Sequence, residues 1–128
     1  MRLDEFRELC LAQPGASESL PFGPDALVFK VRGKMFALLN LERLPETGAL
    51  KCHPERAAEL RERYAGVAPG WHLNKRHWND VVLASDVPAP LIRELVGHSY
   101  ALVVARLTRK ERAALDAEAG ANASDADA

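Results

Sequence analysis

Residues 26–41 have the sequence ALVFKVRGKMFALLNL, and this stretch decides the fold. Along residues 26–32, every second side chain is apolar, which is the period of a half-buried strand. Gly33 follows directly and adopts a positive φ without steric cost, as a tight turn requires. Residues 35–41 are apolar on both faces, as expected of a central strand that helices cover. The stretch therefore predicts a β-hairpin inside a larger sheet.

Further strands are predicted on both sides of this hairpin. A short extended segment at 19–22 precedes it, and residues 49–52 follow it after a turn. The links between these four strands are too short to hold a crossover, so we expect an antiparallel meander. Two more strands are predicted at 71–73 and 78–83, on either side of a polar turn at 74–76.

Helices are predicted before, between and after the strands, because apolar side chains recur there at helical spacing. A helix that starts near Pro88 is expected to break at Gly97, and Ser99 is a good N-cap for the next one. Thr108 and Glu111 have the spacing of a capping box, which predicts a last short helix from Arg109. The other helical segments are residues 3–13, 54–64 and 100–107.

The predicted fold class is α+β, with residues 1–115 as a single domain. It has an N-terminal helix, an antiparallel sheet of about five to six strands with helices packed on one face, and two to three C-terminal helices. Residues 116–128 have no apolar period and are rich in Ala, Asp, Asn and Ser. We expect this acidic tail to be disordered.

Length and composition limit the class of protein. The chain has 128 residues, enough to bury a hydrophobic core without disulfides or metals. No apolar run approaches the roughly 20 residues that span a bilayer, and the first residues lack the apolar core of a signal peptide. We therefore expect a cytoplasmic protein with no membrane partner. Cys10 and Cys52 are far apart, which indicates two free thiols in a reducing compartment.

The net charge of −1 conceals an uneven distribution. Residues 116–128 contain four acidic side chains and no basic one, so residues 1–115 carry 17 basic side chains against 14 acidic ones, or +3. This mild excess is compatible with a polyanionic partner, although committed nucleic-acid binders usually have a larger one.

The densest polar and aromatic segment is residues 71–80, WHLNKRHWND. Cations hold phosphates, indole rings stack on bases, and Asn pairs with base edges. The candidate DNA- or anion-binding residues in this segment are His72, Lys75, Arg76, His77, Trp78 and Asn79. The alternative is that the tryptophans belong to the core and that Lys75 and Arg76 are simply solvated in a turn.

Two other basic groups have equally open interpretations. Lys30 and Arg32 share one face of the hairpin and are candidate binding residues, together with Lys34 at the turn. Exposed charges that deter edge-to-edge pairing explain them as well. Arg106 and the cations at 109–112 either contact phosphates or complement a helix dipole.

Catalytic and metal-binding patterns are absent from the sequence. His72 and His77 are predicted to point to opposite faces of a strand, and no acidic residue lies at ligand spacing. No serine has a nucleophile-elbow context, and no Gly-rich phosphate loop is present. We therefore expect no metal, no cofactor and no enzymatic activity.

Several segments, taken in order, resemble the MmcQ/YjbR-like proteins. The sequence HLNKRHWN at 72–79 carries the resemblance, with SYALV at 99–103 and LTRKER at 107–112. Thr108 stands where proline is expected, and the acidic tail is additional. The resemblance implies a curved antiparallel sheet of the double-wing or CyaY-like type and a DNA-binding role. It supplies no catalytic residues, and Lys75, His77 and Trp78 match its most characteristic positions.

These observations leave three hypotheses. The first is a non-enzymatic DNA-binding protein, in which Lys75, Arg76, Lys30 and Arg32 contact phosphates while Trp78 and Asn79 lie against bases or sugars. The second is a module for a small anionic ligand or a protein partner, with Lys75 and His77 holding the anion and Trp71 or Trp78 forming a wall. The third is a hydrolase or metal enzyme whose groups converge only in space. The sequence does not indicate an oligomeric state.

Overall fold

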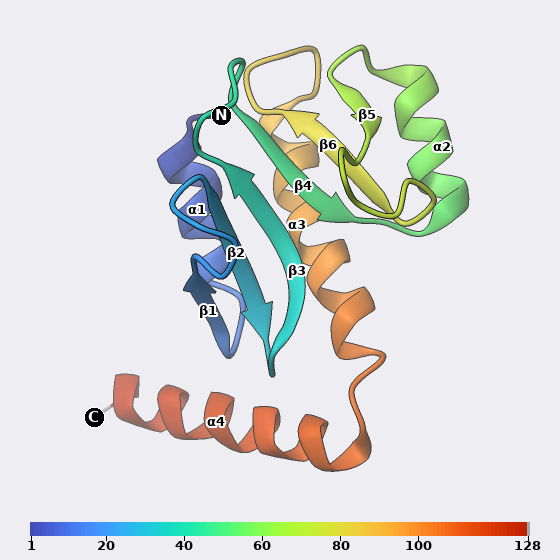
Figure 1. Ribbon diagram of the computed structural model, residues 1–128. Helices are drawn as coiled ribbons and strands as arrows, with labels where there is room; N and C mark the ends of the chain where they lie inside the picture. The colour runs from blue at the N-terminus through green and yellow to red at the C-terminus, as the bar shows by residue number, and fades with distance from the viewer. Residues whose placement is uncertain (128) are drawn as a thin grey trace.

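The computed structural model describes the backbone of residues 1–127 and the side chains of residues 1–118. The described residues form one open six-stranded sheet and four helices (Figure 1). Neighbouring strands are antiparallel throughout, in the order β1-β2-β3-β4-β6-β5. The strands are β1 (Ala16–Ser19), β2 (Ala26–Val31), β3 (Lys34–Asn40), β4 (Thr47–Lys51), β5 (Val67–Pro69) and β6 (Trp78–Val82). The helices are α1 (Leu3–Leu11), α2 (Pro54–Arg63), α3 (Ala89–Val104) and α4 (Arg109–Asp127). This confirms the α+β class, the number of strands and the two C-terminal helices.

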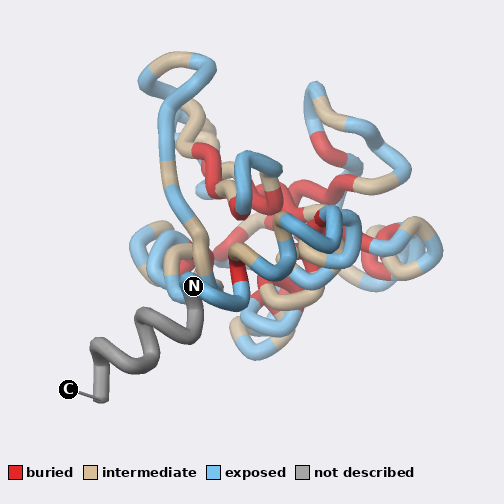
Figure 2. Tube along the Cα trace, turned by 90° about the horizontal axis from the view of Figure 1, so that it is seen from below, coloured by how far each residue is buried: buried red, intermediate tan, exposed pale blue. Residues whose placement is uncertain are grey.

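Helices cover one face of the sheet. α1 and α3 lie behind β2, β3 and β4 in Figure 1, and α2 packs against β5 and β6. The core lies between these layers, where Phe6, Phe29 and Phe36 are fully buried. Figure 2 shows the buried residues gathered in the middle of the molecule, with exposed loops around them.

The opposite face of the sheet, called the open face below, carries no helix among the described residues. Side chains alternate between the faces, so cross-strand neighbours share one. Leu38, Ala49 and Asp80 are such neighbours on β3, β4 and β6, and they lie on the open face. Their neighbours Leu39 and Gly48 face the helices, where Gly48 meets the ring of Phe6.

The predicted hairpin is confirmed as β2 and β3. Arg32 and Gly33 both have positive φ, 48° and 77°, as a two-residue turn of this kind requires. The pairing shifts after Phe29, so that Lys30 opposes Met35 and Phe36 is an extra residue on β3. Such a bulge turns consecutive side chains to one side, and both Phe36 and Ala37 are buried.

Two predicted strands were wrong. Residues 71–73 lie in a loop, and the edge strand is β5 at Val67–Pro69. His72 has a φ of 59°, and the carbonyl of Asn74 accepts hydrogen bonds from His77 and Trp78, so the chain turns here. The first strand is β1 at Ala16–Ser19, three residues before the predicted 19–22.

The predicted break at Gly97 and the cap at Ser99 were also wrong. α3 runs without interruption from Ala89 to Val104. Glycine inside a helix costs only about 1 kcal/mol relative to alanine, and burial of the apolar face of α3 outweighs that cost. Ser99 is fully buried near the middle of α3 instead of starting a helix.

The capping box is confirmed, since the amides of Thr108 and Glu111 each donate to the other side chain at 3.1 Å. The tail expected to be disordered from residue 116 is instead described as helix, because α4 continues to Asp127. Its alanines account for this, since alanine has the highest helix propensity. Residue 128 lies outside the described residues.

Two other expectations concern membranes and thiols. No helix within residues 1–127 is long and apolar enough to cross a membrane. Cys10 and Cys52 are both free and buried, and burial raises the pKa of each thiol.

Candidate functional site

The loop at residues 70–77 covers part of the open face, and it separates the predicted site residues into two groups. Trp78 is only 8% exposed, and Gly70 of the loop lies so close to it that a Cβ added at Gly70 would be 2.9 Å from the Cβ of Trp78. Asn79 is 2% exposed and faces α2, where its amide donates to the carbonyl of Ala57 at 3.2 Å. The expectation that Trp78 and Asn79 contact bases was therefore wrong, since both are structural.

The cations of the loop point outward. Lys75 and Arg76 are exposed, and neither forms an ion pair with any side chain of residues 1–118. The Lys75 ammonium donates to the carbonyl of Gly70 at 3.4 Å within the loop. Arg61 on α2 holds the loop in place by donating to the carbonyl of Lys75 at 3.0 Å.

The two histidines of the loop have different surroundings. His72 is exposed, and its ring lies against the indole of Trp71 with 4.0 Å between ring centroids. His77 is half-buried, and its carbonyl accepts a 2.7 Å hydrogen bond from the amide of Cys52. This bond joins the end of the loop to the end of β4.

Cations from five segments lie toward the end of the sheet that holds the β2–β3 turn. Lys51 is the last residue of β4 and pairs with Trp78, the first residue of β6, so the loop that carries Lys75 and Arg76 ends beside it. Lys34 begins β3, and its ammonium donates to the carbonyl of Arg106 at 3.4 Å. We call this group the basic end, and it consists of Lys30, Lys34, Lys51, Lys75, Arg76 and Arg106.

Most of the basic end is not neutralised by carboxylates. Lys34 lies 4.0 Å from Glu111, and the other five cations form no ion pair within residues 1–118. Partial burial lowers the pKa of Lys51, and the like charges of Arg106 and Lys34 lower it further. Uncompensated like charges at close range favour binding of an anion.

Arg32 was predicted to act with Lys30, but the structure separates them. Lys30 is on β2, whereas Arg32 is in the turn and its guanidinium is 2.8 Å from the carboxylate of Glu118 on α4. Arg32 therefore lies beside the basic end with its charge paired.

A hollow of about 400 Å³ lies on the open face, between the β3–β4 connection and the loop at 70–77. Asn40, Glu42, Arg43 and Trp71 line it. A smaller recess of about 30 Å³ adjoins it, with Leu38, Ala49 and Asp80 at its base. Of the two tryptophans, Trp71 forms the wall expected for a ligand site, and Lys75 and His77 do not line the hollow.

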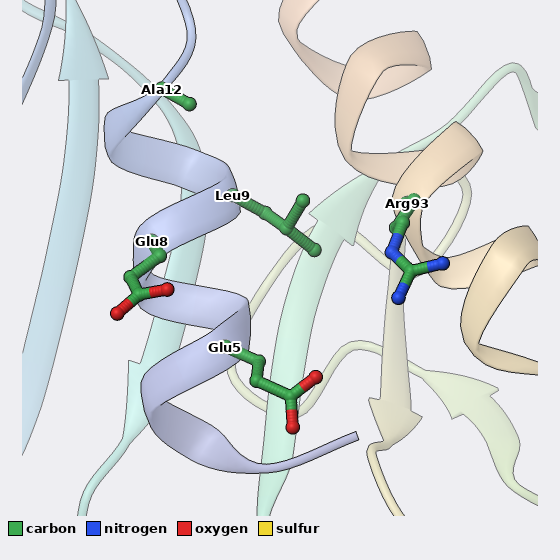
Figure 3. A pocket seen from close by; sticks show the side chains of 5 residues that line it. All are labelled: Glu5, Glu8, Leu9, Ala12 and Arg93. Atoms are coloured by element: carbon green, nitrogen blue, oxygen red, sulfur yellow. The ribbon is translucent and has the colours of Figure 1, made fainter.

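A second hollow of about 340 Å³ lies between α1 and α3 (Figure 3). Glu5, Glu8, Leu9 and Ala12 of α1 line it together with Arg93 of α3. The lining carries two carboxylates and one guanidinium, so its net charge is negative and does not favour an anion.

The described residues contain no group of three or more His, Cys, Asp or Glu side chains that could hold a metal ion. His53 and His98 are close, but the amide of His53 donates to Nε2 of His98 at 3.2 Å, which occupies that nitrogen.

Comparisons with known proteins give the family. The model of the YjbR family matches residues 11–102. The chain belongs to the YjbR family. It is 36% identical to the uncharacterized protein YjbR of Escherichia coli K12, over 88% of this chain and 95% of that protein. It is 33% identical to the uncharacterized protein YbdF of Escherichia coli O157:H7, over 83% of this chain and 87% of that protein. The resemblance found in the sequence is thereby confirmed.

Solved structures agree with the fold of this YjbR-family protein. The crystal structure of Deinococcus radiodurans protein DR2400 superposes with a TM-score of 0.83 at 41% identity, covering 89% of this chain and 87% of that one. A crystal structure of a Pseudomonas syringae protein gives a TM-score of 0.69 at 28% identity, covering 80% and 98%. The matched family segment includes the hollow and most of the basic end, whereas α4 lies outside it.

Sequence reasoning missed Arg43, Asn40 and Lys51. Arg43 lies in a connection and Lys51 ends a strand, so neither stands in a cluster along the sequence. Only the pairing of β3, β4 and β6 brings them beside Trp71 and the other cations.

Proposed function

We propose that this YjbR-family protein is a non-enzymatic DNA-binding protein that contacts phosphates through the basic end. The observation that supports this proposal is the gathering of six cations from separate segments, five of which form no ion pair in residues 1–118. Phosphate contacts supply most of the affinity of sequence-independent binding.

The burial of Trp78 and Asn79 limits the recognition of base sequence by such binding. Neither side chain reaches a base edge in the major groove, and phosphate contacts carry no sequence information of their own. The cations of the basic end thus support binding with little dependence on duplex sequence. The mild positive charge of residues 1–115 is consistent with moderate affinity at low salt.

The test compares two variants that lose the same charge at different places. In the first, Lys51, Arg76 and Arg106 of the basic end are all replaced by Gln. In the control variant, Arg2, Arg63 and Arg93 are replaced by Gln, and these exposed side chains lie away from the basic end. Anisotropy of a labelled duplex is measured at several salt concentrations for both variants and the wild type.

We expect the wild-type dissociation constant to rise steeply with salt, with a slope of about 0.9 per phosphate contacted. The basic-end variant should bind more weakly and have a flatter slope, by about 0.9 for each phosphate that it no longer neutralises. The control variant should keep the wild-type slope. Equal binding by the two variants, or no binding at the lowest salt, would overturn the proposal.

A further inference from the structure

The hollow on the open face contains an aromatic ring that is unusually accessible. Trp71 is 61% exposed, although its backbone is fixed by a 3.2 Å hydrogen bond from its amide to Oδ2 of Asp80. Its ring is supported on one side by His72. An ordered indole with a free face is a platform on which planar rings stack.

Hydrogen-bond donors face the same hollow. Nη1 of Arg43 donates to Oδ2 of Asp80 at 2.7 Å, which fixes the guanidinium, and its other N–H groups have no partner in residues 1–118. Oδ1 of Asn40 accepts from the amides of Glu42 and Arg43, both at 3.1 Å, which leaves the amide nitrogen of Asn40 free to donate. Arg pairs readily with the acceptor edge of guanine, and the free amide nitrogen of Asn40 can donate to an acceptor atom of a base.

The charges in the hollow favour a neutral ring over a phosphate. Arg43 supplies one positive charge, while Asp80 and Glu42 supply two negative ones. Asp80 has a side chain that is 8% exposed and pairs with Arg43, and Glu42 stands at the rim. An added phosphate would meet a net negative site, whereas an uncharged heterocycle with acceptor atoms would meet the donors and the indole.

The hollow and the basic end lie within reach of one nucleic-acid strand. Thr47 at the start of β4 adjoins the hollow, and Lys51 at its end belongs to the basic end. Four residues of strand separate them by about 13 Å. A strand whose phosphates contact the basic end can therefore place a base at Trp71.

We infer that the hollow binds one unpaired nucleobase, stacked on Trp71 with its edge against Arg43 and Asn40, so that the protein prefers single-stranded nucleic acid. The inference rests on the proposed function and specifies the form of nucleic acid bound. In a duplex each base is stacked on both faces and paired at its edge, so neither the indole nor the two donors gain access.

The first experiment compares two single-stranded DNA oligonucleotides of equal length, one normal and one with abasic sites throughout. Both carry the same phosphates, so they differ only in what they present to the hollow. The normal strand should bind about 5- to 150-fold more tightly, the factor expected for stacking of one base on an aromatic ring. It should also quench tryptophan fluorescence, because Trp71 is exposed and Trp78 is buried.

Substitutions at Trp71 test whether the difference in affinity between the two strands depends on the hollow. Trp71→Ala should remove the difference between the two strands and leave the affinity for the abasic strand unchanged, and Trp71→Phe should restore part of it. The basic-end variant should have a lower affinity for both strands, by the same factor. Equal affinity of the wild type for the two strands, or equal loss of both in Trp71→Ala, would overturn the inference.

A second experiment separates this inference from the proposed function. The nucleosides adenosine and guanosine, which carry no phosphate, are titrated while Trp71 fluorescence and the side-chain NMR signals of Arg43 and Asn40 are observed. Response to these nucleosides without binding of any oligonucleotide would overturn the proposed function and keep the base site. Binding of oligonucleotides through the basic end, with no response of Trp71 to bases, would overturn the base site alone.

Discussion

The hydroxyl of Ser99 on α3 donates a hydrogen bond to the carbonyl of Phe36, the extra residue of the bulge in β3. The same oxygen accepts a 2.9 Å bond from the amide of Lys51 on β4. The pairing of β3 with β4 ends at Ala37 and Leu50, so these two backbone groups have no partner in the ladder. Ser99 thus satisfies the backbone groups of β3 and β4 where their pairing ends, at the basic end.

Replacement Ser99→Ala should therefore lower the free energy of unfolding by about 1–3 kcal/mol, because it leaves buried backbone groups unpaired. Urea denaturation measures the loss, and hydrogen exchange at the amide of Lys51 should accelerate. Ser17→Ala, at a position of β1 near the sheet edge, should change the free energy by less than about 0.5 kcal/mol. Equal effects of the two substitutions would contradict this role.

The contact of Gly48 with Phe6 gives a second prediction, in which two glycine substitutions have opposite signs. A Cβ at Gly48 would lie 2.6 Å from Cζ of Phe6, so Gly48→Ala should destabilise the protein by about 1–3 kcal/mol through overpacking. At Gly97, inside α3, a Cβ meets nothing within 4 Å. Gly97→Ala should stabilise the protein by about 0.5–1 kcal/mol, because glycine costs backbone entropy in a helix. Thermal unfolding of both variants checks the signs.

The sequence was sufficient to predict those elements for which the periodicity of apolar residues and the turn or capping residues indicate the same structure. The β2–β3 hairpin follows from alternation and Gly33, and the start of α4 follows from the Thr108–Glu111 box. Local signals failed at Gly97 and Ser99, where a breaker and a cap residue lie inside a helix. There the burial of the apolar face of α3 overrides local preference, which no short window of sequence reveals.

The candidate site was predictable only in part. Lys75 and Arg76 are exposed as expected, but Trp71 and Trp78 have similar sequence surroundings and opposite exposure. Trp78 begins β6 inside the sheet and is 8% exposed, whereas Trp71 lies in the loop outside the sheet and is 61% exposed. The position of the Arg43 guanidinium depends on its hydrogen bond with Asp80. This partner is 37 residues away in the sequence, and only the pairing of the strands brings it close.

His98 should make stability depend on pH. Burial is the main cause that lowers its pKa from the ordinary value of 6.5, and the neighbouring Arg56 lowers it further while Glu94 opposes this effect. The unfolded chain then binds a proton at pH values where the folded chain does not. The contribution of His98 to the free energy of unfolding should be fully present above pH 6.5. It should be lost as the pH decreases from 6.5 to the lower pKa of His98 in the folded protein.

His98→Gln tests this dependence, because the amide oxygen can accept the hydrogen bond from the amide of His53 without titrating. Urea midpoints are measured for both proteins from mildly alkaline to mildly acidic pH. The decline in the acidic range should be shallower in the variant than in the wild type. Parallel curves would show that His98 does not contribute.

The pairing of Arg32 with Glu118 leads to a last prediction, about α4 and the basic end. The carboxylate of Glu118 is 2.8 Å from a guanidinium that lies beside the basic end and close to Lys34 in the chain. Glu118→Gln should release Arg32 for a phosphate, so the salt slope of DNA binding should steepen by about 0.9. Glu59→Gln on α2 changes the net charge equally, and it should leave the slope unchanged.

A double variant tests whether the effect of Glu118→Gln on DNA binding requires Arg32. If it does, Glu118→Gln combined with Arg32→Gln should bind DNA no more tightly than Arg32→Gln alone, because the guanidinium that Glu118 neutralises is no longer there. A gain in affinity that persists in the double variant would mean that Glu118 acts through the general charge of α4 and not through this ion pair. The comparison of single and double variants measures the coupling directly.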